Sequence, residues 1–161
     1  MPKFASVKAL EDYIKEGLRK TVEDGRNKAY DVIHASLLKF YGEYKPEFFK
    51  RTEQVLNSLV KSEVVPTKNG YEARVYFDIG KLHHPESFEF TRYSKRKGTV
   101  KKYSIERKWS EERILNSVML KGHHIYGAKS TAVWVESMAQ LNAEFMAFLK
   151  KELIDNGIPV R

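Results

Sequence analysis

The sequence predicts an α+β domain in which a long N-terminal helix and a long C-terminal helix pack on a small antiparallel β-sheet. Residues 1–41 and residues 131–156 place apolar side chains at three- and four-residue steps, the spacing of an amphipathic helix. Residues 58–108 instead contain segments in which apolar and polar residues alternate, as in strands with one buried face. Helices at the two ends with strands between them favour segregated layers.

The first helix is predicted from an apolar stripe that is interrupted by a polar gap: Val7, Leu10, Ile14, Leu18 and Val22, then Ala29, Val32, Ile33, Leu37 and Phe40. Gly25 costs about 1 kcal/mol relative to alanine in a helix interior, which allows a bend or break there. Gly42 and Pro46 end the helix, because proline disfavours helical geometry in the residue before it.

Two hairpins are predicted in the middle of the chain. The first has a strand in which Val60, Ser62 and Val64 alternate with Lys61 and Glu63, a turn at Asn69-Gly70, and an alternating strand at residues 71–78. The second is a basic hairpin that includes residues 92–108 and has its tip at residues 95–98. Its outgoing arm also carries Phe88 and Phe90, and its return arm carries Tyr103 and Ile105.

Two more helices follow the strands. Residues 110–121 form a short helix with Ser110 as the N-cap, acidic residues in the first turn and Gly122 as the stop signal. The helix at residues 131–156 has Ser130 or Thr131 as its cap and is closed by Gly157 and Pro159. All 161 residues fit a single domain, since domains of roughly 100–150 residues are the commonest size.

Composition excludes several classes of protein. The chain has no cysteine, so disulfides, thiolate nucleophiles and cysteine-based zinc sites are excluded. Its N-terminus lacks the continuous apolar segment of a signal peptide, and no stretch approaches the roughly 18 apolar residues of a membrane span. We therefore expect a protein that is neither exported by a standard signal nor embedded in a membrane.

The net charge of +8 is concentrated in one short segment. Residues 92–108 contain eight basic residues and one acidic residue, whereas the rest of the chain is close to neutral. So local an excess indicates one contact surface rather than a generally basic protein.

Three interpretations of this basic hairpin stay open. Its cationic side chains can dock on an acidic protein surface, or they can follow a phosphate backbone while the interleaved tyrosines stack on bases. Alternatively the hairpin is simply solvated, and its charges keep an edge strand from aggregating. We favour a protein partner and keep nucleic acid as the alternative, because a basic run alone is a weak motif. The contact residues are then Lys95, Arg96, Lys97, Lys101 and Lys102.

Four of the five histidines form two doublets, His83-His84 and His123-His124. A metal site needs three or four converging ligands, commonly at spacings such as HxxxH or HxH, and neither doublet has such a spacing. Adjacent residues on a strand also point to opposite faces. We interpret the doublets as loop residues that face solvent or a partner, and we predict no metal; a two-loop site completed by Asp78 or Glu86 is the weaker alternative.

The sequence contains no motif for nucleophilic catalysis and no glycine-rich cradle for nucleotide phosphates. Paired carboxylates such as Glu111-Glu112 are explained by helix capping and solvation. We therefore expect no enzymatic activity and no cofactor.

Four stretches, taken in order, carry a resemblance to a known family: YKPEFFKRTEQVLNSLV (44–60), GYEARVYFD (70–78), WSEERILNSVMLKGHHIYG (109–127) and TAVWVESMAQLNAEFMAFLKKELIDNGIPV (131–160). Together they resemble the small tail-completion or head–tail joining proteins of long-tailed bacteriophages and prophages. The individual similarities are the segment from Tyr44 to Thr52, the Leu-Asn-Ser at residues 56–58, and a Gly-His loop before the helix that carries Trp134.

The resemblance implies a non-enzymatic structural protein in which a small twisted sheet packs against a long helix. It also implies self-association into a ring, expected to be hexameric, at the neck or tail end of the virion, beside other phage tail or neck proteins. Subunit contacts are then expected at the basic hairpin and at the two histidine loops. The chain departs from the family pattern at Glu53 and His124, where glycine is common, and in its longer hairpin at residues 92–108.

Overall fold

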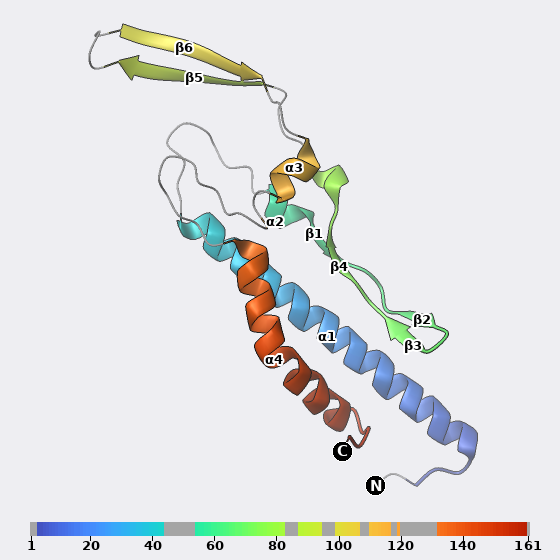
Figure 1. The fold of residues 1–161 in the computed structure, drawn as a ribbon. Helices are drawn as coiled ribbons and strands as arrows, with labels where there is room; N and C mark the ends of the chain where they lie inside the picture. The colour runs from blue at the N-terminus through green and yellow to red at the C-terminus, as the bar shows by residue number, and fades with distance from the viewer. Residues whose placement is uncertain are drawn as a thin grey trace.

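The structure is a computed structural model that describes residues 3–43, 54–82, 87–94, 99–106, 110–116, 119 and 132–160. The elements follow in the order α1 (Val7–Glu43), α2 (Gln54–Ser58), β1 (Leu59–Lys61), β2 (Val65–Thr67), β3 (Gly70–Glu72), β4 (Val75–Phe77), the 3₁₀ helix η1 (Ile79–Lys81), β5 (Ser87–Ser94), β6 (Thr99–Glu106), α3 (Glu111–Asn116) and α4 (Val133–Asp155). Figure 1 shows α4 and the strands β1–β4 alongside α1, with β5 and β6 extending away as a separate ribbon. The predicted α+β architecture is confirmed.

Helices α1 and α4 pack antiparallel, so the two ends of the chain lie at the same end of the molecule (Figure 1). Polar contacts at three levels follow the seam: Lys39 with Glu136, Lys28 with Glu144 at 3.5 Å, and Asn156 Nδ2 donating to Thr21 Oγ1 at 3.3 Å. From the first contact to the third, the residue on α1 lies closer to the N-terminus of α1, and the residue on α4 lies closer to the C-terminus of α4. The two helices therefore run in opposite directions.

Two glycines let these helices approach closely. A Cβ atom on Gly25 would lie 2.8 Å from Leu149 Cδ2, and one on Gly17 would lie 2.9 Å from the carbonyl oxygen of Asn156. Both glycines lie inside α1, which runs unbroken from Val7 to Glu43. The break that the sequence allowed at Gly25 therefore does not occur. The glycine instead lets Leu149 of α4 pack closely against α1.

Strands β1 to β4 belong to one long hairpin that is interrupted by a bulge. Lys61 lies opposite Val75 in the β1–β4 ladder, and Val65 lies opposite Glu72 in the β2–β3 ladder. Three residues on the first arm therefore oppose two on the second, and the extra residue divides the ladder into two short pieces.

Two hydrogen bonds connect the two arms at the bulge. Ser62 N–H donates to the Arg74 carbonyl at 2.9 Å, and Arg74 N–H donates to Ser62 Oγ at 2.9 Å. A hairpin turn is confirmed here, but it lies one residue earlier than the predicted Asn69-Gly70: residues 68–69 join β2 to β3, and Gly70 begins β3 with a φ of 147°, a value that glycine tolerates best.

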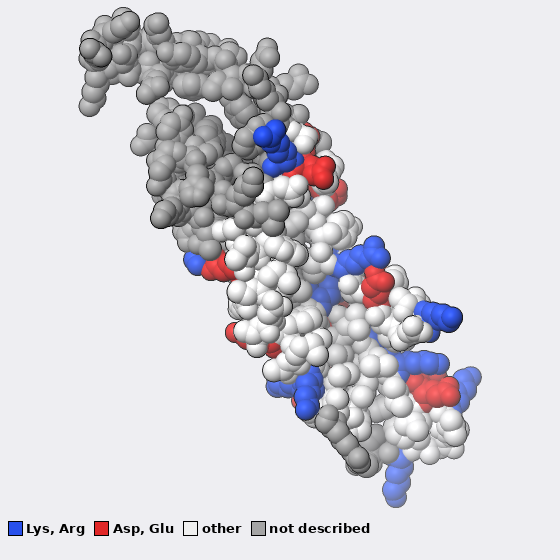
Figure 2. Space-filling view, in the orientation of Figure 1, with Lys and Arg blue, Asp and Glu red and all other residues white. Residues whose placement is uncertain are grey.

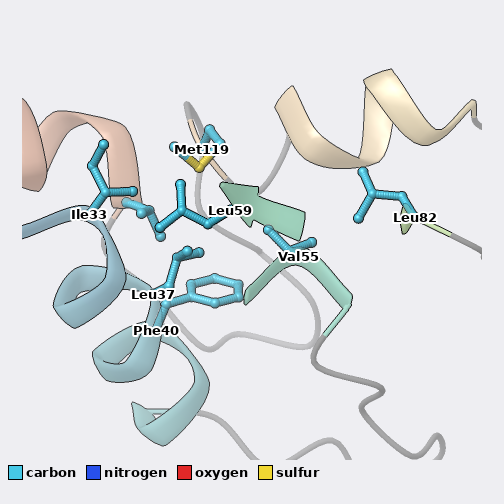
Figure 3. Close-up of a cluster of buried hydrophobic side chains, with 8 residues drawn as sticks. Ile33, Leu37, Phe40, Val55, Leu59, Leu82 and Met119 are labelled. Atoms are coloured by element: carbon cyan, nitrogen blue, oxygen red, sulfur yellow. The ribbon is translucent and has the colours of Figure 1, made fainter. Parts of the chain in front are cut away.

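The hydrophobic core lies where the C-terminal half of α1 meets α2, β1 and the start of α4 (Figure 3). Its members are all buried: Ile33, Leu37, Phe40, Val55, Leu59, Leu82, Met119 and Val133. The second part of the predicted apolar stripe on the first helix supplies three of them, so that part of the prediction is confirmed.

The N-terminal part of α1 remains exposed. Val7 is 75% exposed, and Leu10 and Ile14 are each 39% exposed. These residues belong to the stripe that predicted the helix, but α4 ends at Asp155, near the level of Gly17. Within the described part of the chain, α4 therefore covers the later part of the apolar stripe on α1 and leaves its N-terminal part exposed.

Helix ends agree with the sequence at two of the predicted signals. Arg113 N–H donates to Ser110 Oγ at 3.3 Å, as an N-cap requires, and Gly157 follows the end of α4 with a φ of 81°. The predicted cap of α4 is wrong: the helix starts at Val133, and its N-cap is Ala132, whose side chain cannot accept a hydrogen bond. Ser130, Thr131 and Gly122 lie outside the described residues. Among the described helices, none is long and apolar enough to cross a bilayer.

Candidate interaction surfaces

The ribbon of β5 and β6, here called the β5–β6 arm, holds the described part of the basic segment. Its strands pair antiparallel from Ser87 opposite Glu106 to Ser94 opposite Thr99. The predicted second hairpin is thereby confirmed, with its outgoing strand beginning at Ser87. In Figure 1 the arm lies beyond α3, away from the pair of long helices.

The register pairs residues of the same kind along the arm. From the base toward the tip, Phe88 lies opposite Ile105, Phe90 opposite Tyr103, and Arg92 opposite Lys101. Apolar residue types are therefore paired near the base of the arm and cationic residue types near its tip.

Cationic residues lie near the free end of the arm. Arg92 lies opposite Lys101 in the register, and Lys102 lies next along β6, opposite Thr91. No acidic residue occurs in residues 90–94 or 99–103. The described strands therefore carry part of the local positive charge that the composition of residues 92–108 predicts.

The predicted contact residues fall mostly outside the described part of the chain. Lys101 and Lys102 lie in β6. Outside the described residues lie Lys95, Arg96, Lys97, His83, His84, His123 and His124. Contacts at the histidine loops therefore stay a prediction.

Within the described residues, no group of three or more His, Asp or Glu side chains could hold a metal ion. The clearest perturbed pKa belongs to an exposed pair on α1. Arg19 donates two hydrogen bonds to the Glu16 carboxylate, at 2.9 and 3.0 Å, and these lower the pKa of Glu16 below its usual value. A pair one turn apart on an exposed helix surface serves local helix stability.

A second surface is an open groove between α1, α4 and strands β3 and β4, here called the α1–α4 groove. Its volume is about 440 Å³. The walls are mostly apolar, with contributions from Val22, Ala29, Val75, Trp134, Leu141 and Phe145. Figure 2 shows mostly uncharged residues along the middle of this face of the body, with charged residues gathered toward its sides.

Arg26 is a largely covered cation in this groove, with a side chain that is 10% exposed. Its Nη1 donates to the Ser62 carbonyl at 2.7 Å, and its Nη2 donates to Glu23 at 3.3 Å and to Asn27 Oδ1 at 3.2 Å. Its Nε is buried and has no hydrogen-bond acceptor among the residues that the structure describes. An unpaired buried donor costs about 1–3 kcal/mol, so native structures rarely retain one without a reason.

Sequence reasoning missed this groove because Arg26 falls in the polar gap of the helical stripe. Such a position becomes buried only if another segment crosses it, and here the bulge at Ser62 does so. The neighbouring Gly25 was the available signal, since a glycine inside a helix often marks close approach of another element.

Comparisons with known proteins supply no relative from which a function transfers: no protein-family model matches the chain, and no curated protein or solved structure matches it. The two surfaces and the sequence resemblance are therefore what bears on function.

Proposed function

We propose that the chain is a non-enzymatic structural protein of a phage or prophage tail or head–tail joint, assembling as a ring at the neck or tail end of the virion. The observation that carries the proposal is the ordered series of stretches at residues 44–60, 70–78, 109–127 and 131–160. In this proposal the subunit assembles in the bacterial host cytoplasm and contacts other tail or neck proteins.

The packing of the core supports the proposal. Val55, Leu59, Met119 and Val133 belong to the core and come from three of the four stretches, and Val75 of the remaining stretch packs against them. The resemblance thus rests on segments that meet in space, which is what a common fold would constrain.

The placement of exposed surfaces is also suited to a ring. Each subunit of a ring needs two different contact surfaces, one for each neighbour. The β5–β6 arm and the exposed apolar residues Val7, Leu10 and Ile14 of α1 lie toward opposite ends of the molecule (Figure 1). We assign these two surfaces to the two neighbours.

The test is the molar mass of the purified protein, measured by light scattering over a wide range of concentration and joined to negative-stain electron microscopy. We expect a closed oligomer that gives ring-shaped particles. A double variant, Leu10→Glu with Ile14→Glu, should break the ring, whereas Val65→Glu on the exposed strand β2 should leave it intact.

A mixing experiment tests the assignment of the two surfaces. The pair Lys101→Glu and Lys102→Glu disables the arm, and the pair Leu10→Glu and Ile14→Glu disables α1. A mixture of the two variants retains one working interface, so it should form a dimer and no ring. Monomer at every concentration of the unmodified protein, with no rings by microscopy, would count against the proposal.

Nucleic-acid binding through the arm is the second candidate. The cationic tip, which lacks acidic residues at residues 90–94 and 99–103, favours it. Neutralising Lys95, Arg96, Lys97, Lys101 and Lys102 should then abolish salt-dependent binding to DNA, because each lost phosphate contact lowers the salt slope by roughly 0.9. Neutralising Lys150 and Lys151 on α4 is the matched control. Binding that is unaffected by salt or by the arm variant excludes this function.

A further inference from the structure

The chain contains the dipeptide Asn-Gly twice, at residues 69–70 and at residues 156–157. An asparagine followed by glycine is chemically reactive, because the backbone nitrogen of glycine can approach the side-chain carbonyl carbon of asparagine without obstruction by a Cβ atom. The two copies share this chemistry but lie in different surroundings. A difference in reactivity between them is therefore set by the fold.

Asn156-Gly157 is held by hydrogen bonds at the two groups that this reaction would use. The side-chain Nδ2 of Asn156 donates to Oγ1 of the buried residue Thr21 at 3.3 Å. The backbone N–H of Gly157 donates to the Ile154 carbonyl at 2.9 Å, one of the bonds that close the C-terminus of α4. Attack of the glycine nitrogen on Asn156 would have to break both contacts.

Asn69-Gly70 lies instead at the exposed tip of the hairpin formed by β2 and β3. Asn69 is exposed, and its side chain makes no hydrogen bond to any residue that the structure describes. A Cβ atom at Gly70 would meet no described atom within 4 Å, so the space around this glycine is open. All three residues of β2 are exposed, and the ladder ends at the pair of Thr67 and Gly70. So short and exposed a ladder opens locally at low cost, which frees the Gly70 nitrogen.

We propose that Asn69 is a site of spontaneous deamidation, whereas Asn156 is protected by the fold. The Gly70 nitrogen loses its proton to hydroxide and bonds to Cγ of Asn69. The Cγ–Nδ2 bond then breaks, and the amide leaves as ammonia after taking a proton from water. One molecule of water opens the resulting cyclic imide. The product is aspartate if the new Cγ–N bond is hydrolysed and isoaspartate if the original peptide bond is hydrolysed.

Both products change the tip of the hairpin. Each replaces a neutral amide by a carboxylate, so the net charge of the chain falls by one from +8. Isoaspartate also adds a methylene group to the backbone, and the two-residue turn that pairs Thr67 with Gly70 has no room for it without a change of register. The proposal is independent of the ring, because the tip belongs to neither of the two surfaces assigned to ring contacts.

The two sites can be compared in one sample of the full chain. After incubation in mildly alkaline buffer, cleavage after glutamate releases Asn69 within residues 64–72 and Asn156 within residues 153–161. Mass spectrometry follows the deamidated fraction of each peptide over time, and digestion in heavy-oxygen water marks any deamidation that occurs during sample preparation. Asn69 should react about tenfold or more faster than Asn156, because each hydrogen bond that must open lowers the reactive population about fivefold. The rate at Asn69 should rise with pH.

Unfolding supplies the control for the intrinsic reactivity of the two sequences. In guanidinium chloride the fold is lost, so the two sites should react at similar rates. Thr21→Val removes the acceptor of the Asn156 amide and should raise the rate at Asn156 about fivefold, without affecting Asn69. Thr21→Ser keeps the hydroxyl and is the matched control, and thermal melting verifies that both variants are folded.

Three results would overturn the proposal. The first is an equal rate at the two sites of the folded chain. The second is an Asn69 that stays intact in the folded chain for as long as the denatured chain needs to react. The third is deamidation of Asn69 without isoaspartate, because direct hydrolysis of the side-chain amide gives aspartate alone. An unchanged rate at Asn156 in Thr21→Val would contradict the assigned cause of its protection.

Discussion

Replacing Gly17 by alanine tests how closely α1 and the end of α4 approach. The added Cβ would lie 2.9 Å from the Asn156 carbonyl oxygen and 3.0 Å from Ile158 Cδ1. Both distances are well below the separation of about 3.5–4.0 Å at which nonbonded carbon atoms attract. Because a backbone oxygen is among the obstructing atoms, a side-chain rotation alone cannot make room.

The expected change in the free energy of unfolding combines one stabilising effect and two destabilising effects. Alanine gains about 1 kcal/mol over glycine in a helix interior. Forcing a methyl group into a packed contact costs about 1–3 kcal/mol. Displacing Asn156 also breaks its 3.3 Å hydrogen bond to Thr21, at a cost of about 1 kcal/mol. The net prediction is a loss of about 1–3 kcal/mol in the free energy of unfolding.

Urea denaturation followed by circular dichroism measures this change. The control is Gly42→Ala, because a Cβ there would meet no atom of the described residues within 4 Å, so this variant should be neutral or slightly stabilised. Helix propensity alone predicts that both variants gain stability. If Gly17→Ala is as stable as the unmodified protein or more stable, the close approach described here is wrong.

Three further predictions concern the core, an ion pair and a helix end. Leu37→Ala should lower the free energy of unfolding by about 2–5 kcal/mol, since Leu37 is fully buried, and an unchanged urea midpoint would contradict its place in the core. Arg19→Gln should raise the pKa of Glu16, which NMR titration of its carboxyl carbon measures. The ion pair stabilises the folded state above the usual pKa of glutamate, and this stabilisation is lost as the pH falls through the lowered pKa of Glu16. An unchanged pKa of Glu16 in the variant would contradict the contact. Gly157→Ala should reduce the melting temperature, because a Cβ at a φ of 81° is strained and would overlap the Tyr13 hydroxyl; an unchanged melting temperature would exclude that conformation.

Local patterns predicted the elements well where a single physical signal dominates. The stripe on the first helix, the hairpin turn and the Ser110 cap each depend on a few neighbouring residues, and each is present in the structure, the turn one residue earlier than predicted. The cap of α4 was misassigned because Ser130, Thr131 and Ala132 all precede the apolar stripe, and periodicity locates a helix end only to within a residue or two.

The candidate surfaces were predicted less completely. The charge of the β5–β6 arm is visible in the sequence, but the opposition of Arg92 and Lys101 follows from the register. The α1–α4 groove left almost no sequence signal, because its donor, Arg26, is an ordinary polar position until Ser62 packs against it.

By itself, the sequence determined the α+β class, the long helices, the turn before Gly70 and the local charge of residues 92–108, since these depend on periodicity, turn chemistry and composition along the chain. Tertiary structure alone decided which part of the α1 stripe is covered, why Gly17 and Gly25 are tolerated inside a helix, and that Arg26 is largely covered, with a donor that no described residue accepts. The physical reason is that burial and close approach are set by which segments meet, and residues far apart in the chain make those contacts.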